Sequence, residues 1–395
     1  MDFKKIRIFF LYLLIFLRPF ISSQAFPKIE KFFLIFLVLL TLSFFKEISY
    51  KKYPLLLKIS FLFYLGGGLI SSSQINTFLH FPIYFMGILF FLITLSLNQE
   101  EIKKIIAIII LSGTVVSLYG IYQYQFGFLQ TADYIIKKEP YLFANHLIRN
   151  YLLSRRVFST FFSPNMLAGY LVMVIPLNIG YISEIKGIKK ITFCLFAGIN
   201  FLALFLTKSL GGIFSLIFSF FILLFFVKPK KISLMYLSFS LVILILFTLP
   251  IIISRANRIF DFQNPHNSLV QRYNFMRVSL KIIKENLCKG IGMGNFGDFF
   301  MHYRKESDIR TNYAHNFILQ IQAELGILGS LGIFLLIILF LKDMFSLKGT
   351  SFLRFSLLWA SSSFLIHNFL DISFFIPEVA NFFWIIWPCF KNLSE

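Results

Sequence analysis

The sequence predicts an all-α integral membrane protein with about twelve transmembrane helices and two long extracytoplasmic loops. Of its 395 residues, 57% are hydrophobic and 14% are charged, and the mean hydropathy is +0.78. Soluble domains usually contain about 45–50% apolar and about 25% charged residues. The apolar excess lies in continuous runs, such as residues 32–45, 81–97 and 232–253. Each run approaches the roughly 20 residues that a membrane helix needs, and none alternates as a transmembrane strand does.

The net charge of +20 comes largely from basic residues in short connections between the apolar runs. Examples are "KKIR" (4–7), "KEISYKK" (46–52), "KGIKK" (186–190) and "KPKK" (228–231). This distribution is typical of the positive-inside rule, so the lipid bilayer is the expected partner and nucleic acid is not. The three cysteines, Cys194, Cys288 and Cys389, are too few and too scattered for a disulfide framework or a thiolate metal site.

The order of the spans follows from the apolar runs and from the charges between them. The spans are expected to centre near residues 14, 38, 63, 88, 114, 173, 197, 218, 242, 330, 361 and 383. With the N-terminus in the cytoplasm, the lysine-rich connections, among them 98–104 and 184–190, fall inside. The lysine-poor connections 72–77 and 207–212 then fall outside. Both termini are therefore predicted to be cytoplasmic.

Two long connections divide the chain into five regions. These are N-terminal membrane helices (1–126), an outer loop (127–163), central membrane helices (164–253), a large basic outer loop (254–314) and C-terminal membrane helices (315–395). The basic loop carries Arg255, Arg258, Arg272, Arg277, Arg304 and Arg310. Because a guanidinium group presents a planar fork that fits phosphate oxygens, these arginines indicate an anionic partner at the outer surface.

Residues 268–286 of the basic loop have the spacing of an amphipathic helix. Its apolar positions are Leu269, Tyr273, Met276, Leu280 and Ile283. Such a helix would lie along the membrane interface and carry Arg272 and Arg277 with it. An ordinary surface helix is the open alternative.

His315 is the strongest candidate for chemistry, because it opens a predicted membrane helix in "RTNYAHNFILQIQAELGILG" (310–329). The positive end of a helix dipole disfavours the imidazolium form, and a neutral imidazole can accept a proton from a hydroxyl group. Asn316, Gln320 and Glu324 follow at intervals of four residues and form a polar stripe that must face the bundle interior or a watery cavity. Hydrogen bonding between helices is the alternative role for this stripe.

Two further patterns are interpreted as structural. His367 and Asp371 share a helix face, and bracing of two helices is favoured over a proton relay. "GMGNFG" (292–297) matches a dinucleotide-binding pattern but lacks a preceding strand, so it predicts a flexible turn. The outer loops hold neither a cluster of histidine and cysteine residues nor a paired acidic motif, so we expect a metal-independent reaction without a cofactor.

Three stretches together resemble the family of O-antigen ligases and O-antigen polymerases. They are "RRVFSTFFSPNMLAGYLVMVIPL" (155–177), "RYNFMRVSLKIIKENLCKGIGMGNF" (272–296) and "AHNFILQIQAELGILG" (314–329). A weaker similarity extends over residues 367–384. The resemblance implies a polytopic enzyme of the bacterial inner membrane, with a GT-C-like fold and an active site that faces the periplasm. It also implies an undecaprenyl-diphosphate-linked glycan as donor and a glycan or lipid A-core as acceptor.

The resemblance also implies roles for individual residues. Arg272 and Arg156 would neutralise the departing diphosphate, and His315 would deprotonate or orient the acceptor hydroxyl for a single inverting displacement. The implied substrate-binding residues are Arg155, Asn165, Lys208, Arg277, Lys281, Tyr313 and Asn316. The chain departs from the family pattern in "TKSLGG" (207–212), where Leu210 replaces a common arginine and Lys208 would supply some of the charge.

Three functions remain open from the sequence. A ligase would move a lipid-linked glycan onto an acceptor, whereas a polymerase would join repeat units by the same chemistry. A membrane transporter is the alternative of another class. It is disfavoured because the sequence shows no internal repeat and its arginines cluster at the predicted surface rather than at mid-bilayer.

Overall fold

In the computed structural model the chain is a helical bundle, and the described residues contain no strand. The structure describes residues 3–50, 53–71, 74–144, 146–226, 249–250, 253, 261–264, 267–345 and 351–393. The first helices are α1 (Phe3–Leu17), α2 (Pro27–Ser43), α3 (Phe45–Tyr50), α4 (Leu55–Ile70), α5 (Gln74–Ser96), α6 (Gln99–Tyr122), α7 (Phe128–Lys138), α8 (Pro140–Ala144) and α9 (His146–Ser154). The later helices are α10 (Pro164–Ile182), α11 (Ile188–Thr207), α12 (Leu210–Phe226), α14 (Ser268–Glu285), α15 (Phe296–Tyr303), α16 (Phe317–Phe345), α17 (Phe352–His367) and α18 (Pro377–Asn392).

Four helical stretches of the described chain are long and apolar enough to cross a membrane. They are Gln99–Lys138, Pro164–Ile182, Ile188–Thr207 and Phe317–Phe345. Shorter apolar helices occupy Leu55–Ile70, His80–Ser96 and Leu210–Phe225. Every predicted span centre falls within a described helix except residue 242, which lies outside the described residues. The all-helical, multi-pass class is therefore confirmed, while the count of about twelve spans and the GT-C-like loops stay predictions.

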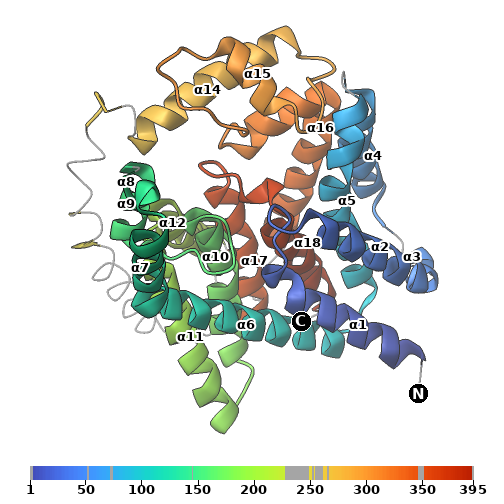
Figure 1. Ribbon diagram of the computed structural model, residues 1–395. Helices are drawn as coiled ribbons and strands as arrows, with labels where there is room; N and C mark the ends of the chain where they lie inside the picture. The colour runs from blue at the N-terminus through green and yellow to red at the C-terminus, as the bar shows by residue number, and fades with distance from the viewer. Residues whose placement is uncertain are drawn as a thin grey trace.

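Ion pairs mark one end of the bundle. They join Lys4 to Glu101 (3.1 Å), Lys103 to Glu184 (3.3 Å) and Lys391 to Asp343 (2.7 Å). Lys4 lies at the start of α1, and Glu101 and Lys103 lie at the start of α6. Glu184 directly follows α10, and Asp343 and Lys391 lie in the final turns of α16 and α18. α1 therefore begins and α18 ends at this end of the bundle. Figure 1 shows α14 and α15 lying across the opposite end.

The two long connections contain several helices. α6 continues through a π-helical turn, η2 (Gln123–Gly127), into α7, and α8 and α9 follow. The basic loop contains α14 and α15, while Arg255 and Arg258 lie outside the described residues. In Figure 1, α7, α8 and α9 lie along one side of the bundle, while α14 and α15 lie across one end.

The amphipathic helix predicted over 268–286 is confirmed as α14. Its buried face consists of Phe275, Val278, Ser279 and Ile282. The predicted apolar positions Leu269, Tyr273, Met276 and Leu280 are instead exposed, at 43–60% of their full areas. Both faces of α14 are therefore apolar. The inner face packs on the protein, and the outer face is free for the membrane contact that the sequence predicts.

A break in α16 positions the glycine-rich turn. Gly326 has φ 62° and ψ −160°, so the backbone there cannot continue the helical hydrogen bonds. The carbonyl oxygens of Ala323 and Glu324 accept instead from Ile291 N (2.8 Å) and Gly292 N (3.0 Å). Residues 290–294 thus form a turn, as the sequence predicted for "GMGNFG", and its hydrogen bonds to the broken helix were not part of that prediction.

We predict that the two ends of the bundle lie on opposite sides of a membrane. A single cysteine placed at Met301, in α15, and another at Lys186, after α10, should react with an impermeant thiol reagent from opposite sides. Each would be introduced into a chain whose three native cysteines are replaced by serine. Labelling of both positions from the same side of sealed vesicles would contradict this arrangement.

Candidate active site

His315 sits in the connection that leads into α16 and has an unusual backbone conformation. Its φ is +52°, in the left-handed region that residues with a Cβ rarely occupy. The imidazole ring stacks on the ring of Phe275 from α14, with centroids 4.9 Å apart and an interplanar angle of 21°. The next residue, Asn316, caps α16, since its Oδ1 accepts from Ile318 N (3.0 Å) and Leu319 N (3.1 Å).

The turn at the end of α17, residues 368–371, receives groups from both α14 and the start of α16. Three successive carbonyl oxygens act as acceptors there. Asn368 O accepts from Phe317 N (3.0 Å), Phe369 O from Asn316 Nδ2 (3.2 Å) and Leu370 O from Arg272 Nε (2.9 Å). Leu370 lies beyond the last residue of α17, so its carbonyl oxygen needs a donor from elsewhere in the chain, and Arg272 supplies it.

Arg272 and His315 therefore lie together, as the sequence analysis requires of them. Arg272 is three residues before Phe275, so both side chains project from the same face of α14. Phe275 contacts the His315 ring, and Arg272 contacts the 368–371 turn on which the start of α16 is fixed.

The buried carboxylate of Asp371 acts electrostatically on both groups. Burial lowers the pKa of His315, Asp371 raises it, and Arg272 lowers it further, so that the net shift is downward. Burial likewise lowers the pKa of Arg272, and Asp371 opposes this effect. The imidazole is therefore held neutral, as predicted, but burial is the main cause rather than the helix dipole.

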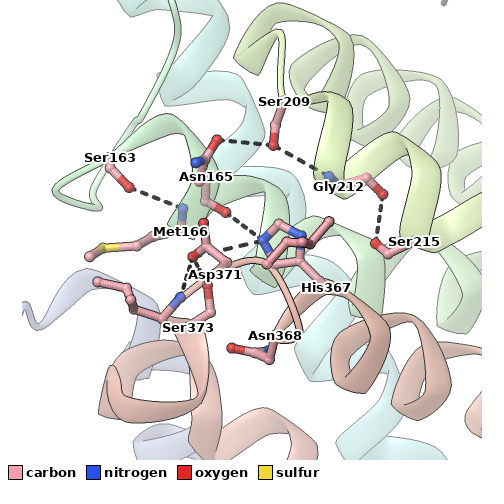
Figure 2. Close-up of polar contacts among 12 residues, drawn as sticks. Ser163, Asn165, Met166, Ser209, Gly212, Ser215, His367, Asn368, Asp371 and Ser373 are labelled. Atoms are coloured by element: carbon pink, nitrogen blue, oxygen red, sulfur yellow. Dashed lines mark hydrogen bonds and ion pairs between the residues drawn. The ribbon is translucent and has the colours of Figure 1, made fainter. Parts of the chain in front are cut away.

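Figure 2 shows how Asp371 also connects to α10 through His367. His367 Nε2 lies 3.9 Å from Asp371 Oδ1 and 3.2 Å from the backbone oxygen of Asn165. The carboxylate is fixed further by Ile372 N (2.8 Å) and by the Ser373 hydroxyl (3.1 Å), which both donate to Oδ1. The bracing role that the sequence favoured for this pair fits these contacts. Asp371 was interpreted from the sequence as a structural residue and not as part of the site.

Asn165 links His367 to Arg156. Its side-chain Oδ1 accepts from Arg156 Nη2 (3.1 Å) and from the Ser209 hydroxyl (3.0 Å, Figure 2). Arg156 Nε also donates to Thr207 O (3.0 Å). A continuous set of polar contacts thus runs from Arg156 through Asn165 and His367 to Asp371.

Arg155 and Lys208 lie beside Arg156. Lys208 Nζ donates to Ser154 O (2.8 Å), which brings its charge to the turn that carries both arginines. Arg155 and Lys208 both have left-handed backbone conformations, with φ 44° and 52°. Leu210, the first residue of α12, is half-buried against the apolar core. A cationic side chain is thus present near this turn although Leu210 carries none.

The remaining candidates make no hydrogen bond or ion pair with Arg272, Arg156 or Asp371 within the described residues. Arg277 pairs with the buried Asp308 at 2.5 Å, and Lys281 is exposed on α14. Tyr313 stacks on Phe375, with centroids 6.4 Å apart. Burial and, secondarily, Glu324 and Glu378 raise the pKa of Tyr313 to about 12, so its hydroxyl stays protonated.

A comparison with protein families bears on the kind of protein to which this arrangement belongs. Residues 194–340 match the family model described as O-antigen ligase. Over this segment, which is less than half of the chain, the protein is similar to the O-antigen ligase family. The matched segment contains Arg272 and His315, whereas Arg156, Asn165 and Asp371 lie outside it. A comparison with curated proteins finds no match. The match supports an O-antigen ligase- or polymerase-type activity.

We predict that Arg277 stabilises the connection after α15 through Asp308. Arg277→Ala and Asp308→Ala should each accelerate thermolysin cleavage within residues 304–312, and the double variant should show no additive effect. We expect a coupling energy of about 0.5–3 kcal/mol between the two side chains. The exposed Arg310→Ala serves as the control. A raised KM for the donor in Arg277→Ala, without the same change in Asp308→Ala, would instead favour direct substrate binding by Arg277.

Proposed function

We propose that the protein is an O-antigen ligase of the bacterial inner membrane. It transfers an undecaprenyl-diphosphate-linked glycan to a hydroxyl group of a glycan or lipid A-core acceptor at the periplasmic face. The observation that carries the proposal is the meeting of Arg272, a neutral His315 and the contacts that lead to Arg156 at one end of the bundle. The position of both chain termini at the opposite end supports cytoplasmic termini.

Arg272 and Arg156 bind the donor diphosphate in this proposal. Arg272 uses Nε for the carbonyl oxygen of Leu370, and its two terminal nitrogens make no hydrogen bond within the described part of the chain. A guanidinium edge held in this way can donate to phosphate oxygens. Arg155 and Lys208 add positive charge beside Arg156, and Asn165 orients it. Together these cations stabilise the negative charge that develops on the leaving diphosphate.

His315 activates the acceptor. Its neutral imidazole accepts the proton of the attacking hydroxyl group while the hydroxyl oxygen forms a bond to the anomeric carbon of the donor sugar. The bond between that carbon and the diphosphate oxygen breaks, so undecaprenyl diphosphate leaves and the configuration inverts. Asn316 and Tyr313 flank His315 and would contact the sugars, and the exposed Lys281 would guide the donor head group. Arg277 would support the same helix.

We predict that Arg272→Ala and His315→Ala each lower kcat/KM for glycan transfer by at least about 10²-fold, because each removes a group that acts in the transition state. The measurement is product formation in proteoliposomes that contain EDTA, with a lipid-diphosphate glycan as donor and lipid A-core as acceptor. Lys284→Ala, at an exposed position on the last turn of α14, is the matched control and should retain activity.

Full transfer by both variants would remove the active-site assignment. Products in which the donor glycan is added to a second lipid-linked unit, and none on lipid A-core, would identify a polymerase. Movement of a solute without any glycan product would favour a transporter.

We predict that Asp371→Asn moves the acid limb of the pH profile of kcat/KM to lower pH. Asp371 raises the pKa of His315, so loss of its negative charge lowers that pKa further. Because the neutral imidazole is the active form, activity then persists to lower pH. Asp298→Asn, an exposed acid on α15, is the control. A limb that stays in place or moves to higher pH would contradict the role of Asp371.

A further inference from the structure

One buried carboxylate on α16 takes no part in the proposed reaction. Glu324, on α16, is 2% exposed. Its Oε2 accepts from the Tyr84 hydroxyl of α5 (2.7 Å), and its Oε1 accepts from Gln320 Nε2 (2.8 Å) and Gly294 N (3.1 Å). All three partners donate, so both carboxylate oxygens serve as acceptors.

Gln320 connects Glu324 to Ala314, the residue before His315, through hydrogen bonds at both ends of its amide. While its Nε2 donates to Glu324, its Oε1 accepts from Ala314 N at 2.6 Å. An amide that is turned over would point its NH₂ group at the Ala314 N–H, and two donors cannot form a hydrogen bond. The acceptor character of Glu324 therefore determines which end of the Gln320 amide faces the backbone of Ala314.

The backbone at His315 needs such support. A residue with a Cβ in the left-handed region costs about 1–3 kcal/mol and persists only where its surroundings impose that conformation. On the C-terminal side, Asn316 and Phe317 are fixed to the 368–371 turn. On the N-terminal side, the hydrogen bond from Ala314 N to Gln320 adjoins the strained residue directly.

We propose that Glu324 is a positioning residue for His315. It holds the Gln320 amide with its oxygen towards Ala314 N, and this fixes the left-handed backbone that aims the imidazole at the acceptor. Through Gly294 and Tyr84 the same carboxylate ties this backbone to the glycine turn and to α5. The inference rests on the proposed function for its catalytic consequence, but the backbone restraint itself can be measured separately.

The test compares matched substitutions on α16. Gln320→Leu removes the contact with Ala314, whereas the control Gln322→Leu removes a similar hydrogen bond, from Gln322 Nε2 to Leu287 O (3.0 Å), that does not reach His315. We expect Gln320→Leu to lower kcat about 10²-fold with little change in KM for the donor, because misplacement of the base affects the chemical step. Gln322→Leu should retain activity. Gln320→Met, a smaller change in shape, replaces the leucine variant if that variant fails to insert.

Rescue at position 324 separates positioning from general packing. Glu324→Gln can still accept through its amide oxygen from Gln320 and Gly294, while its NH₂ group faces the Tyr84 oxygen. This variant should stay within about threefold of the wild-type kcat, whereas Glu324→Leu should lose about as much as Gln320→Leu. Equal losses in Glu324→Gln and Glu324→Leu would overturn the proposed role of the hydrogen bonds.

Two further readouts report on His315 itself. Hydrogen exchange at the amide of Ala314 should accelerate in Gln320→Leu and stay slow in Gln322→Leu. The acid limb of kcat/KM should also move to higher pH in Gln320→Leu, because a loosened imidazole loses some of the burial that lowers its pKa, while Asp371 and Arg272 still act on it. Unchanged exchange together with an unchanged kcat in Gln320→Leu would overturn the inference. Full activity of His315→Ala would overturn the proposed function, and the exchange comparison would still test the restraint.

Discussion

The turn at the end of α17 is the constraint on which the candidate site depends. Its carbonyl groups at residues 368, 369 and 370 accept hydrogen bonds from the start of α16 and from Arg272 of α14. These carbonyl groups lie at and beyond the C-cap of α17, so they need donors from other parts of the chain. α14, which lies outside the bundle in Figure 1, is thereby held in register with α16 and α17.

Burial is the main cause of the pKa shifts of Arg272 and His315 beside this turn. A buried guanidinium or imidazolium group loses the stabilisation of water, and a nearby carboxylate can restore only part of it. Asp371 supplies this carboxylate between Arg272 and His315, and it is itself fixed by hydrogen bonds from residues 372 and 373. In the proposed reaction, this balance keeps Arg272 charged for the diphosphate and His315 neutral for the attacking hydroxyl group.

A second layer of contacts supports this centre from α16. The break at Gly326 frees backbone acceptors that the glycine turn uses, and Glu324 joins the same turn through its side chain. α4 packs closely on α16 just beyond the break, since a Cβ at Gly67 would lie 2.5 Å from Gly329 N. The strained backbone at His315 therefore rests on an element that is itself fixed on several sides.

Local features of the chain predicted much of the fold. Continuous apolar runs determine that the protein is helical and multi-pass, and a period near 3.6 residues locates α14 within a residue of its observed end. Arg272 and His315 could be proposed because an arginine-bearing helix and a histidine at a helix start are both visible locally. The second, buried face of α14, with Phe275 and Val278, was not predicted, since periodicity identifies an apolar face but not the protein surface that another face packs on.

Only the tertiary structure decided which distant residues meet. Asn165 and His367 are 202 positions apart, and no local pattern relates them. No local pattern predicted the pairing of Arg277 with Asp308, which takes a predicted substrate-binding residue away from the centre of the site. Nor did one predict that Asp371 acts on His315. The sequence by itself determined the helices and the chemical groups they carry. The packing of the helices decided which of those groups lie together, because neighbours in a bundle depend on contacts among all its faces rather than on the period of any one helix.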